Sequence, residues 1–285
     1  MKPDFKFCFY KIIMKIKLIG LIILVPTLIA SCSKDLPVDN FPDESYSIKS
    51  VWSEGKTSAK YIYNKDGKII ESQGFYYFKK FNYDLNGRLV KKEIAVDPDI
   101  ASSTMHEKTE LMTSANSTFT GYSEFEYDCD SKLMIIKNYL KENDQYEYRS
   151  MNSIEYEGDK IVRMNLHDAQ NIMTQCYTYE YDASGNVIKE KYYSYLFLVG
   201  TEPKLISEVS FKFDNKNNPY RIYKDLGLPG LYSNKNNILE TSTILFVDVP
   251  GINKYTTSKT AYEYNDQGFP VKVSTDNSEY EYKYE

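Results

Sequence analysis

A pattern of about ten residues recurs along most of the chain after residue 60. Two aromatic residues separated by one residue are followed by Asp or Asn, two or three turn-forming residues that often include Gly, a basic or polar residue, and an aliphatic pair. Seven segments fit this pattern, namely 61–70, 81–90, 125–134, 154–162, 179–188, 211–220 and 262–271, and an eighth opens at 280–284. Strands alternate with a period of two, so each segment predicts a β-hairpin.

The second segment shows how such a turn should form. Asp84 caps a type I turn, Asn86 takes its second corner, and Gly87 adopts the left-handed conformation that produces a G1 bulge. This loop places Tyr83 opposite Leu89. Aromatic residues and the first aliphatic residue of each segment then share one face, which we interpret as packing within the sheet, whereas Glu, Asn and Lys occupy the other.

The pattern resembles the YD repeat of the Rhs family, and segment 81–90 is a near match. It also resembles Bacteroidetes lipoproteins with YD-like strands, grouped as domains of unknown function with a porin-like fold. Their Asn-Pro-aromatic loop with a following Lys-Asn-Asn is matched by 218–220 and 235–237. The resemblance implies a large antiparallel sheet and no established activity. Residues 45–285 are therefore predicted to be all-β, a curled antiparallel meander of hairpins; whether it closes into a barrel is left open.

The first 31 residues differ in kind from the rest. Three lysines lead into the apolar run 18–29, which at about 12 residues is shorter than the roughly 20 that a transmembrane helix needs. A charged start and an apolar middle are typical of a signal peptide. We interpret residues 1–13 as an upstream extension from a misplaced start codon.

The leader ends in Leu28-Ile29-Ala30-Ser31-Cys32, which resembles the bacterial lipobox. Cleavage before Cys32 and lipidation of its thiol are predicted, because several acyl chains together hold a protein stably on a membrane. Residues 32–44 then form a polar, proline-punctuated tether. The protein is expected in the cell envelope, lipid-anchored at the outer membrane; the sequence leaves open whether it faces the periplasm or the surface.

Charge limits the partners that this chain can have. Without the leader, which holds five Lys and one Asp, the chain carries 30 basic and 39 acidic residues, a net charge of −9. Binding to DNA or RNA depends on neutralising phosphates, so we do not expect a nucleic-acid partner. The chain also holds 28 Tyr and 14 Phe against one Trp, and Tyr favours strands with half-buried faces.

The usual catalytic and metal motifs were sought and not found. The two histidines, His106 and His167, have no ligand-spaced partner for zinc, and His167-Asp168 is at best a fragment of a catalytic triad. No nucleotide-binding loop or Gly-x-Ser-x-Gly elbow occurs. We therefore expect no cofactor, no metal and no catalysis.

Acidic residues at repeated positions leave two alternatives open. Strand carboxylates recur at Glu126, Glu155, Glu180 and Glu263. They could serve a glycan hydrolase, which needs two carboxylates at the right separation, but solvated residues paired with Lys and Arg are the simpler interpretation. Turn carboxylates recur at Asp66, Asp128, Asp130 and Asp182. They could bind calcium, although capping of the turns is expected.

Strand geometry also bears on Cys129 and Cys176. If all the turns lie at one edge, Cys129 sits in a turn and Cys176 six residues before Asp182, roughly 20 Å away along the strand. Disulfide Cα atoms lie within about 7 Å, so these cysteines should not pair.

Segments between the repeats close the other edge. Residues 95–120 are predicted to be a polar loop with a short helix near 105–113, and residues 192–210 two long strands. Residues 224–242 form the largest irregular insertion. Loops on a rigid scaffold often carry function, so the candidate binding surface is Tyr220, Leu228, Leu231 and Tyr232. The favoured function is a noncatalytic, membrane-anchored binding or scaffold protein whose partner is a glycan or an envelope protein. A glycan hydrolase and an outer-membrane β-barrel are the alternatives.

Overall fold

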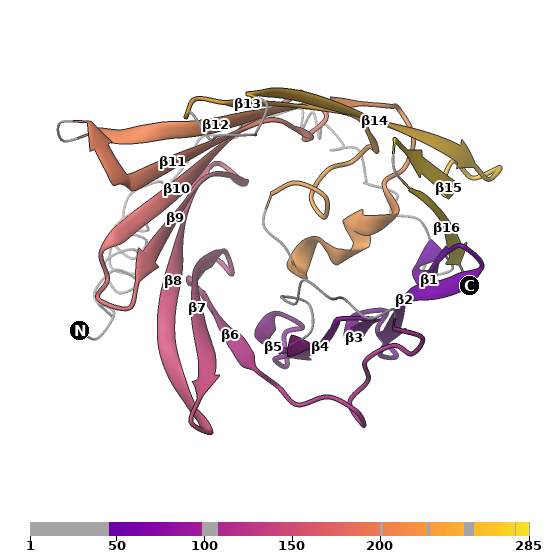
Figure 1. The fold of residues 1–285 in the computed structure, drawn as a ribbon, viewed down its shortest axis with the longest axis horizontal. Coiled ribbons are helices and arrows are strands. Elements are labelled where there is room, and N and C mark those ends of the chain that lie inside the picture. Colours follow the sequence, from indigo (N-terminus) through magenta and orange to yellow (C-terminus); the bar gives the residue numbers. More distant parts are fainter. Residues whose placement is uncertain are drawn as a thin grey trace, which may run out of the picture.

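A computed structural model describes residues 46–98, 108–199, 202–226, 229–247, 254–276 and 278–284. Sixteen strands in these ranges form one closed antiparallel barrel. Strands that follow one another in the chain are paired, and β1 pairs with β16 to close the ring (Figure 1). The predicted all-β meander is confirmed, and its closure into a barrel is now established.

The first eight strands are β1 (Ile48–Ser53), β2 (Lys56–Tyr63), β3 (Ile69–Gly74), β4 (Tyr77–Tyr83), β5 (Leu89–Val96), β6 (Gly121–Tyr127), β7 (Leu133–Glu142) and β8 (Gln145–Glu157). The second eight are β9 (Lys160–Asp168), β10 (Met173–Tyr181), β11 (Val187–Val199), β12 (Glu202–Phe213), β13 (Ile238–Leu245), β14 (Tyr255–Tyr264), β15 (Pro270–Thr275) and β16 (Glu279–Tyr284). A 3-10 helix, η3 (Pro219–Leu226), lies between β12 and β13. Within the described ranges, no helix is long and apolar enough to cross a bilayer.

Six of the seven predicted hairpins form where the repeats lie. They are β2–β3, β4–β5, β6–β7, β8–β9, β10–β11 and β14–β15. The segment 211–220 is the exception: β12 pairs with β13, and the intervening residues 214–237 leave the sheet. Pro219 cannot donate a hydrogen bond to a strand ladder, and the asparagines around it bond to other parts of the chain, as described below.

The second hairpin has the predicted turn. The Gly87 N–H donates to the Asp84 carbonyl at 2.9 Å, and Gly87 has a φ of +73°. Asp84 Oδ1 accepts hydrogen bonds from the backbone N–H groups of Asn86 and Arg88, and these bonds, with the Arg88 guanidinium, lower the pKa of Asp84. Tyr83 lies opposite Leu89. The local sequence therefore specifies both the turn and the register.

The turn carboxylates divide into two groups. Asp128 and Asp182 cap their turns by accepting backbone N–H groups, at 2.9 Å from Lys132 and Asn186. Asn64 caps the first turn in the position expected for an aspartate. The backbone N–H groups of Asp66 and Asp130 donate to the side chains of Asn64 and Asp128, so the caps of these two turns lie two residues earlier.

The described segments outside the hairpins match the predictions in part. Strands β11 and β12 are the two long strands expected in residues 192–210. The helix predicted near 105–113 lies partly outside the described residues, and residues 108–113 are not helical. The Met112 N–H donates to the Gly74 carbonyl at the end of β3 instead of to a helical turn.

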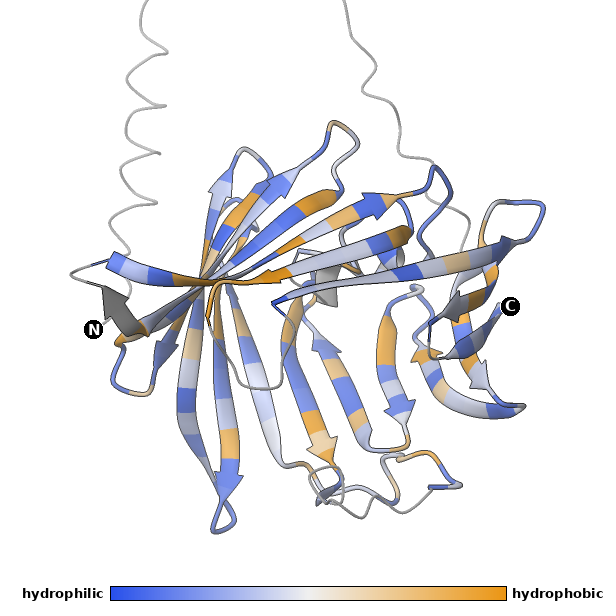
Figure 2. Ribbon diagram, turned by 45° about the horizontal axis from the view of Figure 1, so that its top comes forward, coloured by the Kyte–Doolittle hydropathy of each residue, from blue (hydrophilic) through white to orange (hydrophobic). Residues whose placement is uncertain are grey.

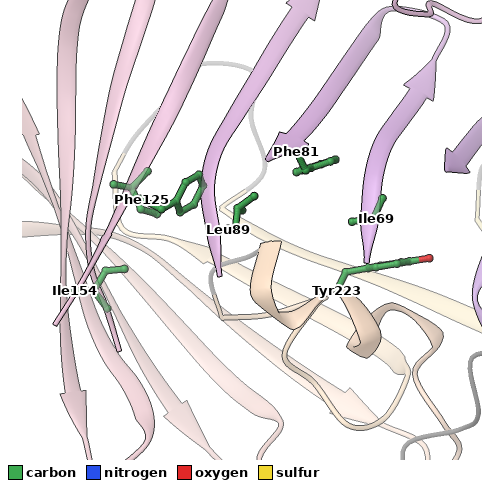
Figure 3. Packing of buried hydrophobic residues seen from close by; sticks show 7 residues of the cluster. Ile69, Phe81, Leu89, Phe125, Ile154 and Tyr223 are labelled. Atoms are coloured by element: carbon green, nitrogen blue, oxygen red, sulfur yellow. The ribbon is translucent and has the colours of Figure 1, made fainter. Parts of the chain in front are cut away.

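The aromatic face of the sheet points into the barrel. Tyr223 of η3 is 3% exposed and packs in one cluster with Ile69, Phe81, Leu89 and Phe125 from the wall (Figure 3). Residues opposite these wall residues across the ladder share their inward face. The repeat therefore builds an aromatic interior, and η3 lies inside the ring (Figure 1).

The opposite face carries charges in cross-strand pairs. Opposed pairs of unlike charge are Glu71–Lys80, Lys80–Glu93, Lys91–Glu124, Glu124–Lys137, Glu155–Arg163, Glu180–Lys189, Lys191–Glu208, Lys212–Glu240, Glu240–Lys259, Glu263–Lys272 and Lys272–Glu281. Figure 2 shows the resulting alternation of hydrophilic and hydrophobic residues along the strands. The outer wall thus carries a belt of alternating charge, together with a few aromatic side chains such as the stacked Tyr122 and Tyr139.

Tyrosine hydroxyls join each hairpin to its neighbour on the inward face. Each donates to the backbone carbonyl of an aliphatic or proline residue at the start of an adjacent strand: Tyr63 to Ile48, Tyr83 to Ile69, Tyr127 to Leu89, Tyr156 to Leu133, Tyr181 to Ile161, Tyr262 to Ile238 and Tyr284 to Pro270. These carbonyls lie beside the bulges, where the ladder is interrupted. Tyr63, Tyr83, Tyr127, Tyr156 and Tyr181 are each the second aromatic of a repeat, and the hydroxyl satisfies a backbone acceptor that Phe could not reach.

Removing one such hydroxyl should weaken the fold measurably. The Tyr181→Phe change deletes the 2.7 Å bond to the Ile161 carbonyl and should lower the free energy of unfolding by about 1 kcal/mol. Tyr177→Phe is the matched control, because no hydrogen bond of the Tyr177 hydroxyl is seen within the described ranges. Urea unfolding of both variants checks this, and equal stabilities would contradict the proposed role of the hydroxyl.

Candidate functional site in the barrel interior

Residues 214–237, here called the inner loop, are held to the wall by side-chain amides (residues 227 and 228 lie outside the described ranges). Asp214 and Asn237 close the base of the loop: the Asn237 N–H and Nδ2 donate to the two carboxylate oxygens of Asp214, each at 3.0 Å. Asn218 Nδ2 donates to the carbonyls of Leu231 and Asn234 at 2.7 and 2.9 Å. The Asn-rich motifs in the sequence are therefore a clamp that fixes the loop.

The inner loop is hydrogen-bonded to the turn between β10 and β11. Asn186 Oδ1 accepts the N–H groups of Lys235 and Asn236 at 2.8 and 3.0 Å, and Asn234 Oδ1 accepts the Val187 N–H at 2.8 Å. Four of the other repeats have Lys or Arg at the position of Asn186, whereas Asn218 and Phe269 take it in the sixth and seventh segments. An amide side chain can both donate hydrogen bonds to the backbone and accept them from it. Asn186 therefore makes the fifth hairpin the place where the inner loop binds.

This arrangement places two residues of the predicted binding surface inside the barrel. Tyr220 and Tyr232 pack against the inward wall, where burial raises the pKa of both phenols. They occupy an interior position, because the loop folds into the barrel instead of over its edge. Leu231 is 48% exposed, and Leu228 lies outside the described residues. Tyr220 packs edge to face against Tyr232 and lines a small pocket together with Leu231, so these three predicted residues lie close together.

Basic side chains form a second ladder at the turn end of the barrel. In the first four hairpins, the basic residue just before the first aliphatic residue of the second strand lies over the tyrosine ring of the next hairpin. The pairs are Lys68 with Tyr83, Arg88 with Tyr127, Lys132 with Tyr156 and Lys160 with Tyr181, at 5.3, 5.1, 5.3 and 5.2 Å from the ring centroids. Cation–π contacts of this kind contribute about 0.5–1 kcal/mol at exposed sites. The repeat thus places cations and aromatic rings in layers at this rim.

A hollow of about 550 Å³ opens at this rim between the second, third and fourth hairpins. We call it the mouth hollow. Its apolar floor is formed by inward residues that include Leu89, Tyr127, Leu133 and Tyr156, and its rim by the basic residues and turns. Ligand sites commonly combine an apolar lining with a few placed polar groups. This hollow lies among the repeats themselves, apart from the inner loop.

Charges at the rim are largely neutralised. Arg88 pairs with Asp84 at 2.8 Å, and Lys132 pairs with Asp159 at 3.0 Å while its Nζ donates to the Gly158 carbonyl. These contacts hold the cations at fixed positions around the hollow. A neutral or weakly charged ligand would therefore meet ordered polar groups above an aromatic floor.

The wall of β6, β7 and β8 carries inward polar side chains deeper in the barrel. Ser123 donates to Asn138 Oδ1 at 2.8 Å, and Asn138 Nδ2 donates to Asn152 Oδ1 at 3.2 Å. On β11, Glu190 lies opposite the buried Tyr179, and burial raises the pKa of its carboxyl group. The interior therefore changes from aromatic at the turn end to polar farther along the strands.

The histidine that the sequence raised for catalysis is not set up as a triad. His167 Nε2 lies 3.2 Å from Ser153 Oγ, but Asp168 Oδ1 accepts the backbone N–H groups of Gln170 and Ile172. His167 Nδ1 is buried and has no partner within the described ranges. Asp168 therefore caps a turn and does not orient the imidazole, and His106 lies outside the described residues.

The strand carboxylates lie on the outer wall, where each meets a basic residue. Glu126 pairs with Lys137, Glu180 with Lys191 at 3.2 Å, and Glu155 approaches Arg163 at 3.9 Å. Glu263 lies opposite Lys272. Within the described ranges, no group of three or more His, Cys, Asp or Glu side chains gathers at metal-binding distance.

The two described cysteines are separate. Cys129 is exposed in the turn between β6 and β7, whereas Cys176 is buried within β10, where burial raises the pKa of its thiol. Both are free, in positions that agree with the predicted separation. Cys32, the leader and the tether to residue 44 lie outside the described residues.

Comparison with known proteins finds remote likenesses of fold. No family model and no curated protein matches the chain. A porin-like protein from Bacteroides vulgatus is 12% identical, with 84% of this chain and 98% of that one covered and a TM-score of 0.48. A porin-like protein from Bacteroides uniformis is 10% identical over the same shares, with a TM-score of 0.38. TcdB2-TccC3 is 10% identical, with 76% of this chain and 12% of that one covered and a TM-score of 0.29. The architecture itself is established by the strand pairing.

Proposed function

We propose that this protein is a noncatalytic lipoprotein of the cell envelope, anchored through Cys32 and binding a glycan at the mouth hollow. The observation that carries the binding role is the 550 Å³ hollow with a floor of tyrosine and leucine and ordered charges at its rim. Sugar rings stack on aromatic faces while their hydroxyls need polar partners, and this hollow offers both. The relationship to YD-repeat lipoproteins, suggested by the repeat, belongs to the same proposal.

A glycan array with the purified protein tests the binding role. Tyr156→Ala, which removes part of the floor, should reduce binding at least tenfold, or about 1.4 kcal/mol. Tyr181→Ala is the matched control, because Tyr181 has the same repeat position, hydroxyl bond and overlying lysine but does not line the hollow. Equal loss in both variants, or a blank array, would remove the support for a glycan; a pull-down from envelope extracts tests a protein partner instead.

Anchoring is tested at the predicted lipobox. Mass spectrometry of the native protein should find acyl chains on Cys32, and Cys32→Ala should release the protein from membranes. Protease shaving of intact cells then distinguishes a surface position from a periplasmic one. An unmodified thiol in membrane-extracted protein would contradict the anchor.

Closure of the sheet favours the alternative of a membrane-spanning barrel, but the charges on the outer wall argue against it. Lipid-facing strands need an apolar exterior, and a charge there costs about 2–4 kcal/mol near the bilayer centre. Here the exterior carries the belt of alternating charge along its strands. Residues 45–285 should therefore stay in solution without detergent, and aggregation rescued by detergent would favour the spanning barrel. Glycan hydrolysis lost on one Glu→Gln change would favour the enzymatic alternative.

A further inference from the structure

Two lysines point into the barrel from neighbouring strands. Lys79 precedes the inward Phe81 by two residues on β4, and Lys92 lies opposite Phe81 on β5. Alternation along a strand places both on the inward face. Such diagonal neighbours have Cα atoms roughly 7–8 Å apart, so the two ammonium groups share one region of the interior.

Neither ammonium group has a counter-charge in the part of the chain that the structure describes. Within the described ranges, Lys79 Nζ lies 4.8 Å from the centroid of the Tyr77 ring and Lys92 Nζ lies 5.9 Å from that of Phe125, and no ion pair or hydrogen bond of either is found. Their outward neighbours differ. Lys91 pairs with Glu93 at 3.1 Å, and Lys80 lies opposite Glu71 and Glu93.

Holding these two ammonium groups close together lowers the stability of the ligand-free protein. Burial lowers the pKa of Lys79; burial, and then the charge of Lys79, lower the pKa of Lys92. Two like charges held in a region of reduced dielectric repel each other. Within the described ranges, no ion pair compensates the cost of desolvating either ammonium group. An anion bound between them would remove both costs at once.

The surroundings indicate what kind of anion fits. Ser72 lies opposite Lys79, and Ser123 lies opposite Lys92 and is linked to Asn138. The lysines are partly accessible to solvent. This wall offers hydroxyl and amide groups beside the rings of Tyr77, Phe81 and Phe125, which favours a hydroxylated ligand over a lipid tail.

We propose that the barrel interior binds a small hydrophilic oxyanion, of the class of a carboxylate- or sulfate-bearing sugar, between Lys79 and Lys92. The site lies on β4 and β5, deeper than the mouth hollow, and does not depend on it. Glucuronate and inorganic sulfate share the required chemistry, and their relative affinity distinguishes an acidic sugar from a bare inorganic anion.

Isothermal titration of the full-length protein with glucuronate, sulfate and neutral glucose tests this site. The Lys79→Gln, Lys92→Gln double variant should lose at least tenfold in affinity for the anions, whereas glucose should not bind in either protein. The Lys80→Gln, Lys91→Gln double variant is the matched control, since it removes the same charge from the same strands on the outer face. It should bind the anions as the wild type does.

Thermal unfolding provides a readout that separates binding from folding. Without ligand, the inward double variant should melt at the same or a higher temperature than the wild type, because it lacks the repelling charges. A bound anion stabilises the folded state by mass action, so the anion should raise the melting temperature of the wild type and of the outward control only. Absence of anion binding at about 10 mM, or equal binding by both double variants, would overturn the site.

Discussion

Raising the pH above about 10 should unfold the barrel within roughly two pH units. Burial raises the phenol pKa of eight tyrosines well above the ordinary 10.0. They are Tyr61, Tyr63, Tyr179, Tyr181, Tyr223, Tyr262, Tyr264 and Tyr284. The folded state therefore keeps these protons at a pH where the unfolded chain releases them. Their contribution to stability is complete below pH 10 and is lost as the pH rises further.

The expected size of this effect follows from proton linkage. Each tyrosine that stays protonated only in the folded state removes about 1.4 kcal/mol of stability per pH unit above its unfolded pKa. Several together should exhaust the 5–15 kcal/mol typical of a domain near pH 11–12. Lys79 and Lys92 act in the opposite sense up to the ordinary lysine pKa of 10.5, since their pKa values are lowered. Two lysines cannot offset the larger number of tyrosines.

Tyrosinate absorbance and far-ultraviolet circular dichroism should be followed in one pH titration. We expect the buried tyrosines to ionise together with the loss of strand signal, in a steep transition after the exposed ones have titrated. Urea unfolding should give similar stabilities at pH 7 and pH 9, because both lie below the unfolded pKa. A gradual titration of all tyrosines with the strand signal intact would contradict a tyrosine-filled interior.

Truncating Tyr223 should have the largest effect of any single change in η3. Tyr223 is 3% exposed, packs against Ile69 and Phe81, and shares a hydrogen bond with the Tyr63 hydroxyl. Removing a buried aromatic ring costs about 3–5 kcal/mol through lost burial and the cavity left behind. Tyr223→Ala should therefore lower the free energy of unfolding by that amount.

Two controls separate the ring from its hydroxyl and from exposed tyrosines. Tyr223→Phe keeps the ring and should cost about 1 kcal/mol. Tyr255 is 64% exposed at the start of β14, so Tyr255→Ala should change stability by less than about 0.5 kcal/mol. If Tyr223→Ala is no more damaging than Tyr255→Ala in urea unfolding, the inner loop contributes nothing to the core.

Once the register of the hairpins is known, the sequence predicts which side chains face the barrel interior. The Tyr-Asp-turn-Gly-Arg-Leu order of the repeat fixes which residues share a face, and Lys79 falls in phase with Phe81 and Tyr83. This alternation predicts that Lys79 points inward, although lysine is normally a surface residue. The mouth hollow gave no local signal, since it forms only where three successive hairpins pack side by side.

The sequence by itself determined the hairpins, because their turns depend on contacts within a few residues: Asp84 and Gly87 specify a loop that would form in any sheet. The tertiary structure decided the closure of β1 on β16 and the course of residues 214–237. Closure depends on the summed twist and stagger of sixteen strands, which no single repeat encodes. The inner loop entered the barrel because a ring of this size leaves an interior that wall side chains alone do not fill, so Tyr220, Tyr223 and Tyr232 gain more burial inside than outside.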